Sequence, residues 1–177
     1  NPDGEITLLN GTQNQTLCED TAITPIEFTL AGGATSSSII WDVTPTGLSY
    51  NTTTHTLSGS PTGIANQTAY TYTITTGGSG CTAGTISGTI TVDPLDELAI
   101  NDPATQIQTV CAGDPIQNIV FTYGGGATGS TISWDLDPGL GFIDGGLGSS
   151  ATISGTPAVN INTTTTYTYT LTSTGGS

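Results

Sequence analysis

Residues 69–79 read Ala69-Tyr70-Thr71-Tyr72-Thr73-Ile74-Thr75-Thr76-Gly77-Gly78-Ser79, and residues 166–177 repeat the run as Thr166-Tyr167-Thr168-Tyr169-Thr170-Leu171-Thr172-Ser173-Thr174-Gly175-Gly176-Ser177. In both runs an apolar side chain alternates with a threonine. Successive side chains of a β-strand point to opposite faces, so this period of two predicts a strand with one face in a core and one hydroxyl-lined face. The stretch predicts an all-β fold and a chain built from two copies of one unit.

The two copies match over most of their length. Cys18, Phe28, Trp41, Asp42 and Pro45 recur 93 positions later as Cys111, Phe121, Trp134, Asp135 and Pro138. Beyond a Gly-rich loop, Gly59 and Pro61 recur 96 positions later as Gly155 and Pro157, which places a three-residue insertion in that loop. Such internal similarity indicates a repeat architecture, and we expect domains at residues 1–94 and 95–177.

Short strand patterns separated by Gly and Pro fill the first copy, with no helical period. We expect strands at Glu5–Leu9, Thr12–Leu17, Ile26–Leu30, Ser38–Thr44, Thr56–Ser58, Ala69–Thr76 and Thr85–Val92. This pattern predicts two tandem immunoglobulin-like β-sandwich domains. The second copy reaches Ser177 before any counterpart of Thr85–Val92, so we expect it to lack its last strand, to leave a sheet edge unfilled and to be the less stable half.

The strand with the tryptophan is expected to face the core. Ile39, Trp41 and Val43 share one face in the first copy, and Ile132, Trp134 and Leu136 share it in the second. An exposed tryptophan that stacks on a sugar ring is the alternative. Apolar residues two positions before and after each tryptophan favour the core interpretation.

The charge balance excludes several classes of partner. The chain has no Lys or Arg and 14 acidic residues, which gives a formal net charge of −14. Binding to a phosphate backbone needs cationic side chains, and so does docking on an anionic membrane surface. No apolar run is long enough to cross a bilayer. We expect no nucleic-acid partner and no direct membrane insertion.

The sequence also lacks the groups that catalysis needs. Its one histidine, His55, lies in the polar turn that begins at Asn51 and has no histidine counterpart in the second copy. We expect His55 to be a solvated loop residue, the protein not to be an enzyme, and no cofactor to be bound.

Three cysteines leave the disulfide pattern open. Cys18 and Cys81 flank the first copy's central strands, Cys111 matches Cys18, and a counterpart of Cys81 would follow Ser177. The economical interpretation is one disulfide per repeat, Cys18–Cys81, with Cys111 left unpaired by truncation. Such a bond implies an oxidising, extracellular compartment. The alternatives are three free thiols, or a Cys111 that pairs between molecules.

Acidic residues gather where the copies meet. Asp93, Asp96, Glu97 and Asp102 offer oxygen ligands of the kind that Ca²⁺ prefers. The alternative, that they are solvated residues of an acidic linker, is favoured because no dense ligand motif appears.

Longer blocks carry a family resemblance. They are Val110-Cys111-Ala112-Gly113-Asp114-Pro115-Ile116, Phe121-Thr122-Tyr123-Gly124-Gly125-Gly126-Ala127-Thr128-Gly129, Ile153-Ser154-Gly155-Thr156-Pro157 and the Tyr-Thr run from Tyr167 to Ser177. In this order they resemble the tandem repeats of SprB-type gliding-motility surface adhesins of Bacteroidetes, giant proteins exported by type IX secretion.

The resemblance implies a place and a role. Many such domains in series form filaments on the bacterial cell surface that grip a substratum. Asp20-Thr21-Ala22 matches the O-glycosylation pattern of that phylum, which makes Thr21 a candidate acceptor. We therefore expect an extracellular structural spacer whose partners are neighbouring repeats of the same chain, and surface glycans or the substratum. A glycan-binding module and an S-layer or sheath subunit are the alternatives.

Overall fold

The Tyr-Thr runs form the long strands β7 (Thr68–Gly78) and β14 (Tyr169–Gly175). In β7 the side chains of Tyr70, Tyr72 and Ile74 are buried while those between them are exposed or half-buried, as the period of two predicts. The computed structural model describes residues 2–78, 81–146, 148–158 and 163–175. Ser79, Gly176 and Ser177, at the ends of the two quoted runs, lie outside the described residues.

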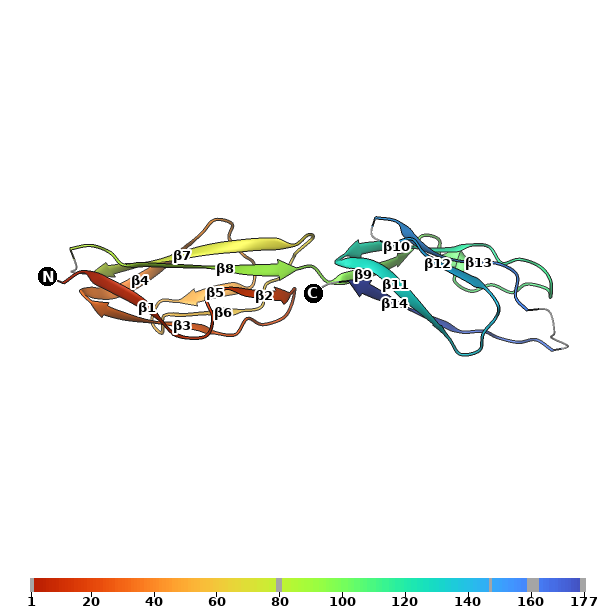
Figure 1. Ribbon diagram of the computed structural model, residues 1–177, viewed down its shortest axis with the longest axis horizontal. Coiled ribbons are helices and arrows are strands. Elements are labelled where there is room, and N and C mark those ends of the chain that lie inside the picture. Colours follow the sequence, from red (N-terminus) through yellow and green to blue (C-terminus); the bar gives the residue numbers. More distant parts are fainter. Residues whose placement is uncertain (1, 79–80, 147, 159–162, 176–177) are drawn as a thin grey trace. The chain divides into compact units, whose positions relative to one another are not determined.

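The fold is all-β, with two immunoglobulin-like sandwiches in tandem (Figure 1), which confirms the expected fold class. The chain divides into two compact units, unit 1 at Asn1–Pro94 and unit 2 at Leu95–Gly176. The described part of the chain contains no helix with the length and hydrophobicity that a membrane crossing needs.

Unit 1 consists of two four-stranded sheets. One has the order β1-β3-β6-β5 and the other β2-β8-β7-β4. All neighbouring pairs are antiparallel except β2 and β8, which run parallel. The remaining strands are β1 (Gly4–Asn10), β2 (Gln15–Cys18), β3 (Ile26–Gly32), β4 (Ala34–Trp41), β5 (Leu48–Asn51), β6 (Thr56–Gly59) and β8 (Thr85–Asp93).

Unit 2 repeats this plan with fewer strands. Its sheets have the orders β12-β13-β10-β9 and β11-β14. The strands are β9 (Asp96–Ile100), β10 (Ile119–Gly125), β11 (Ala127–Trp134), β12 (Gly141–Asp144) and β13 (Ser150–Ser154), and a short 3₁₀ helix, η1, covers Pro103–Thr105. Among the residues described, unit 2 has no counterpart of β2 or β8, so β14 pairs only with β11.

The core of unit 1 lies between its two sheets. Tyr72 is fully buried at its centre, with its ring against Trp41 at a centroid distance of 5.5 Å and against Phe28 at 6.4 Å. In unit 2 the equivalent Tyr169 packs on Trp134 at 5.4 Å, yet Tyr169 is only half-buried. The tyrosine of this aromatic arrangement is therefore buried in unit 1 and partly exposed to solvent in unit 2.

Two details of the expected strands are wrong. Val43 and Leu136 are 55% exposed and do not continue the core face of the tryptophan strand. Strands β4 and β11 end at the tryptophan because the next residue is an aspartate whose carboxylate accepts the following N–H group and turns the chain. In addition, Leu48–Asn51 forms the strand β5, which the sequence pattern did not predict.

Candidate functional site

Asp42 joins the end of β4 to the start of β7. Its Oδ1 accepts the N–H of Val43 at 2.7 Å and that of Thr71 at 2.8 Å, while its own N–H donates to the Thr71 carbonyl at 3.0 Å. The hydrogen bond from Val43, then that from Thr71, lowers the pKa of Asp42 below its ordinary value of 3.8. The ionised carboxylate thus fixes the local geometry of two strands.

Asp135 repeats the arrangement in unit 2. Its Oδ1 accepts the N–H of Thr168 at 2.7 Å and that of Leu136 at 2.8 Å, and its N–H donates to the Thr168 carbonyl at 3.0 Å. The hydrogen bond from Thr168 is the largest cause of the lowered pKa of Asp135. The recurrence of Asp42 and Asp135 therefore has a structural role in each repeat.

A buried serine ties the two sheets of unit 1 together. The Ser37 hydroxyl on β4 shares hydrogen bonds with the Tyr50 hydroxyl on β5 at 2.6 Å and with His55 Nδ1 at 2.9 Å. Strands β4 and β5 belong to different sheets, so these bonds cross the sandwich. Burial raises the pKa of Tyr50 above 10.0, which keeps its hydroxyl protonated and able to donate.

Ser130 is the equivalent tie in unit 2, with different partners. Its hydroxyl on β11 bonds the Tyr123 hydroxyl on β10 at 2.8 Å, and its N–H donates to Asp144 Oδ2 at 3.2 Å. Asp144 Oδ1 also accepts the Tyr123 hydroxyl and the N–H of Gly146. The bond from Tyr123 is the largest cause of the lowered pKa of Asp144. Ser130 thus links the same pair of layers through another tyrosine.

Ser37 and Ser130 were not among the residues expected from the sequence to have a role, although a signal was present. Ser37 lies two residues before Ile39 on the core face of its strand, and Ser130 recurs at the common spacing of 93. A polar residue that recurs on a core face needs a hydrogen-bond partner inside the fold. That reasoning predicts the sheet-to-sheet tie without the structure.

His55 is not the solvated loop residue expected from its polar turn. It is half-buried, takes a positive φ of 54° and bonds Ser37, while its carbonyl accepts the N–H of Phe28 at 3.0 Å. A serine beside a histidine is the pairing that a nucleophile requires. The Ser37 hydroxyl, however, is buried and already shared with Tyr50, so the pair faces the interior between the sheets and cross-links them.

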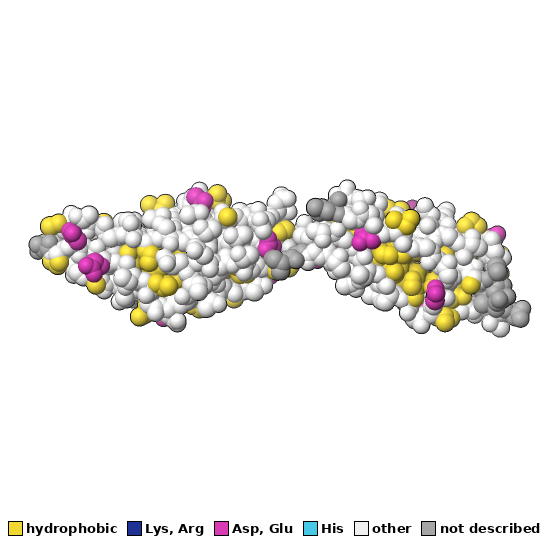
Figure 2. All heavy atoms as spheres, viewed as in Figure 1, with side chains coloured by type: hydrophobic (Ala, Val, Ile, Leu, Met, Phe, Trp, Pro, Cys, Tyr) yellow, Lys and Arg dark blue, Asp and Glu magenta, His cyan; other side chains and the backbone are white. Residues whose placement is uncertain are grey.

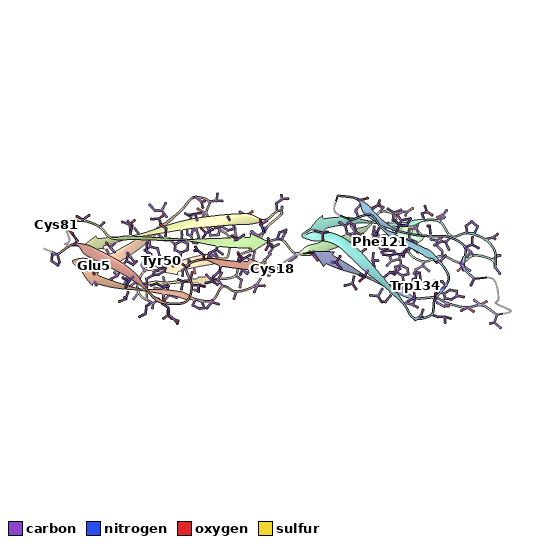
Figure 3. The ribbon with its side chains drawn as sticks, viewed as in Figure 1. Glu5, Cys18, Tyr50, Cys81, Phe121 and Trp134 are labelled. Atoms are coloured by element: carbon purple, nitrogen blue, oxygen red, sulfur yellow. The ribbon has the colours of Figure 1, made fainter. Side chains whose placement is uncertain are left out.

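The expected Cys18–Cys81 disulfide is not formed. Cys18 ends β2 opposite Asp93, the last residue of β8, whereas Cys81 precedes Thr85, the first residue of β8. At about 3.3 Å per residue the length of β8 alone separates them by roughly 26 Å, against the 7 Å or less between Cα atoms that a disulfide requires. Figure 3 shows the two residues at opposite ends of unit 1. The error came from assuming that a cysteine before one strand and a cysteine after another meet at the same end of the sandwich.

The acidic residues proposed as calcium ligands have several separate roles. Asp93 is buried and its Oδ1 accepts Gln67 Nε2 at 2.6 Å. Asp102 follows the far end of β9 and caps η1 by accepting the N–H of Ala104 at 3.0 Å, so the length of β9 separates it from Asp96 and Glu97. Within the described ranges no three His, Cys, Asp or Glu side chains are grouped so as to hold a metal ion.

Thr21 lies in an exposed turn of unit 1. Its N–H donates to the Cys18 carbonyl at 3.2 Å, and the preceding Asp20 takes a positive φ of 62°. The side chain of Thr21 is exposed. A transferase would therefore reach its hydroxyl without unfolding the domain.

The chain enters and leaves unit 1 at opposite ends of the sandwich. At one end the N–H of Gly4, the first residue of β1, donates to the Thr82 carbonyl at 2.8 Å, three residues before β8 begins. At the other end β8 finishes at Asp93, and only Pro94 and Leu95 precede β9. The whole length of β8 separates the two ends, as Figure 1 shows for this unit.

The outer edge of β14 is the main difference between the units. In unit 1 the corresponding edge of β7 is covered by β8 over eight residue pairs, from Thr68 with Val92 to Thr75 with Thr85. Among the described residues of unit 2 no strand lies on that side of β14. Tyr169 Oη, which is buried, has no hydrogen-bond partner, whereas the equivalent Tyr72 hydroxyl donates to the Gln13 carbonyl at 3.0 Å.

Comparisons with known proteins give no family. No family model matches the sequence, and no curated protein matches it. Among solved structures, one titled "Protocadherin gammaB7 EC3-6 cis-dimer structure" is similar with a TM-score of 0.47 and 13% identity, over 86% of this chain and 38% of that chain. This chain therefore spans less than half the length of that structure's chain.

Proposed function

We propose that the chain is a structural segment of a long adhesin filament on a bacterial cell surface, in which it acts as a stiff spacer. The observation that carries the proposal is the separation of the two ends of unit 1 by the length of β8. A domain whose chain enters at one end and leaves at the other lengthens a tandem array with every repeat. A domain with adjacent ends would add bulk and little length.

The connection between the units supports stiffness. It consists of Pro94 and Leu95, and Pro94 is buried. The preceding Asp93 is held by Gln67. A two-residue connection with a proline has far fewer conformations than a Gly/Ser tether, which favours a spacer over a flexible tether.

The strand order of unit 1 suits a load applied along the chain. Strand β2 lies parallel to β8, with Gln15 opposite Ile90 and Cys18 opposite Asp93. Tension draws the N-terminal strands toward one end of the sandwich and β8 toward the other. The hydrogen bonds between β2 and β8 are then loaded together in shear, and none opens before the others.

The surface agrees with an extracellular spacer. Acidic side chains are scattered over the visible face without any basic ones (Figure 2), as a net charge of −14 with no Lys or Arg requires. Uniform negative charge keeps neighbouring filaments apart. The resemblance to SprB-type repeats supports a bacterial surface location, export by type IX secretion, a role in adhesion or gliding, and a sugar on the exposed Thr21.

The mechanical part of the proposal is tested by pulling the full chain from its two ends in an optical trap. Glu19 donates its N–H to the Asp93 carbonyl, so the N–H of Leu17, two residues earlier on the same side of the strand, also faces β8. Leu17→Pro therefore removes a donor of the β2–β8 pairing, whereas Ser49→Pro removes a donor of β5, at the edge of the other sheet, and is the control. We expect Leu17→Pro to lower the rupture force of unit 1 well below that of the Ser49→Pro protein. Equal forces for the two variants would refute the load path through β2 and β8.

The location is tested separately on the source cells. Antibodies against the chain should label intact cells, and the intact mass of the native protein should exceed the sequence mass by a sugar that Thr21→Ala removes. Labelling only after the cells are lysed would exclude a surface filament. Saturable binding of the isolated chain on a glycan array would favour the glycan-binding alternative over the spacer.

A further inference from the structure

We propose that Asn66 is an acceptor site for an N-linked sugar, and that the substrate is a sugar activated by a phosphate group at its anomeric carbon. The motif is Asn66-Gln67-Thr68, which has the form Asn-x-Ser/Thr of N-glycosylation acceptors. The site does not depend on the spacer role, because it concerns one loop of unit 1. It is also distinct from the O-linked position at Thr21.

The motif alone does not select a site, because five asparagines of the chain begin one. A usable acceptor must be exposed, must have a side-chain amide without a hydrogen-bond partner in the fold, and must lie outside the strand ladders, so that a transferase can reach it. The five asparagines are Asn10, Asn14, Asn51, Asn66 and Asn162, the last of which lies outside the described residues.

Hydrogen bonds hold two of these asparagines in place. Asn14 Oδ1 accepts the N–H of Thr89 on β8 at 2.9 Å. Asn51 Oδ1 accepts the N–H groups of Thr53 and Thr54 at 2.8 and 3.1 Å, in the turn that follows β5. Each side chain would have to leave its partners in the folded chain before its amide could react. The fold therefore protects both residues.

Asn10 is exposed, but its segment is held at the backbone. It is the last residue of β1 and pairs with Glu27 of β3. The next residue, Gly11, packs so closely that a Cβ on it would lie 2.5 Å from the Pro25 carbonyl oxygen. A transferase could therefore take up this segment only after the end of the β1–β3 pairing had opened.

Asn66 meets the three requirements. It is exposed and lies in the loop between β6 and β7, two residues before β7 begins. Among the described residues, no hydrogen bond holds its side-chain amide. The Thr68 hydroxyl donates to the Asn66 carbonyl at 2.8 Å, so the hydroxyl of the motif lies close to its asparagine. The acceptor group is thus presented to solvent in the folded chain.

The neighbouring contacts place this acceptor at one end of unit 1. The Glu19 carboxylate accepts the N–H groups of Gly63 and Ile64, in the loop just before the motif. The N–H of Glu19 donates to the carbonyl of Asp93, the last residue of β8, at 2.8 Å. An N-linked sugar is bulky and needs a surface position. At Asn66 it would lie near the end of the sandwich at which β8 finishes.

The reaction is a glycosyl transfer. The side-chain nitrogen of Asn66 forms a bond to the anomeric carbon of the donor, and the bond from that carbon to the phosphate oxygen breaks. The leaving phosphate keeps the electron pair of the broken bond, and the amide nitrogen gives one proton to a base of the transferase. A nucleotide-linked donor would add a single sugar, whereas a lipid-linked donor would add an oligosaccharide. The mass added to the Asn66 peptide distinguishes the two sources.

The test in vitro uses the folded full chain, UDP-glucose and a purified N-glucosyltransferase that recognises Asn-x-Ser/Thr. Peptide mapping by mass spectrometry measures the rate of modification at each asparagine. We expect Asn66 to be modified about tenfold faster, or more, than Asn14 or Asn51, which become accessible only after local opening. Equal rates at the three asparagines would overturn the proposal.

Capped peptides of residues 62–70 and 47–55 are the control for sequence preference. They carry the motifs of Asn66 and Asn51 without the fold, and we expect them to be modified at similar rates. If the peptides showed the same preference as the folded chain, the transferase would be selecting by sequence and the structural argument would fail.

Variants of the motif and the native protein complete the test. Thr68→Ala should abolish modification at Asn66, Thr68→Ser should retain it, and Asn51→Gln should leave it unchanged. In the protein isolated from the source cells, we expect sugar mass on the Asn66 peptide and none on this peptide in an Asn66→Gln protein from the same cells. An unmodified Asn66 peptide in the native protein would overturn the proposal, whatever the result in vitro.

Discussion

The hydroxyls of Ser37 and Tyr50 meet at 2.6 Å between the two sheets of unit 1. Ser37 is buried, and its second partner is His55 Nδ1 at 2.9 Å. Polar contacts of this kind inside a sandwich fix how one sheet lies on the other, because a buried hydroxyl that loses its partner is costly. Unit 2 preserves the serine and changes the partners, so the tie is a common feature of both repeats.

Replacement of the Tyr50 hydroxyl tests this tie. Tyr50→Phe leaves Ser37 bonded to His55 alone, and we expect it to lower the free energy of unfolding of unit 1 by about 1 kcal/mol. Tyr123→Phe removes two hydrogen bonds in unit 2, one of them to a carboxylate, and should cost more. Urea unfolding measures both changes in stability, with Trp41 fluorescence as the signal for unit 1 and Trp134 fluorescence as the signal for unit 2. An unchanged midpoint for Tyr50→Phe would show that the hydroxyl contributes nothing to stability.

Acid should destabilise both units through equivalent aspartates. Hydrogen bonds hold the pKa values of Asp42 and Asp135 below 3.8 in the folded chain. Their contribution is thus complete at pH values above 3.8 and is lost as the pH falls through the lower folded values. We expect the melting temperature of each unit to decrease as the pH is lowered below 3.8.

The control for the loss of stability at low pH is the double variant Asp42→Asn with Asp135→Asn. Asparagine keeps an acceptor oxygen for the two N–H groups and cannot be protonated in this range. The double variant should therefore show a flatter dependence of melting temperature on pH below 3.8. A slope equal to that of the parent protein would assign the acid sensitivity to other carboxylates.

Unit 2 should unfold before unit 1. Among the described residues, the apolar cluster of unit 1 has 11 buried side chains and that of unit 2 has four, so unit 2 removes less apolar surface from water. Tryptophan fluorescence during thermal melting reports unit 1 in the Trp134→Phe protein, which keeps Trp41, and unit 2 in the Trp41→Phe protein, which keeps Trp134. Coincident transitions, or a later transition for unit 2, would contradict this order.

Gly88 is predicted to be indispensable to the core of unit 1. Its missing side chain leaves room for the Tyr72 hydroxyl, which reaches Gln13 across β8. We expect Gly88→Ala to destabilise unit 1 by about 1–3 kcal/mol through overpacking. Ser87→Ala, on the solvent face of the same strand, is the control and should change stability by about 0.5 kcal/mol or less. Adding Tyr72→Phe to Gly88→Ala should recover part of the loss, because it removes the nearer of the two Tyr72 atoms in the clash.

Two errors share a physical origin in tertiary structure. The pairing of Cys18 with Cys81 assumed that residues at strand ends meet, but the direction of β8 places them at opposite ends of the sandwich. The solvated position expected for His55 was inferred from its polar turn, yet the turn folds back so that Nδ1 reaches Ser37. Neither the direction of a strand within a sheet nor the fold of a turn is encoded in local composition.

By itself the sequence determined the strand class, the two copies and the core face of the Tyr-Thr strands, because side-chain alternation and repeat spacing are local properties of the chain. Only the tertiary structure decided which strands became neighbours. It showed that Ser37 crosses between sheets, that β1 and β8 put the ends of unit 1 far apart, and that Tyr169 Oη is buried with no hydrogen-bond partner among the described residues. These facts depend on contacts between residues far apart in sequence, and their energies arise only when the sheets pack together.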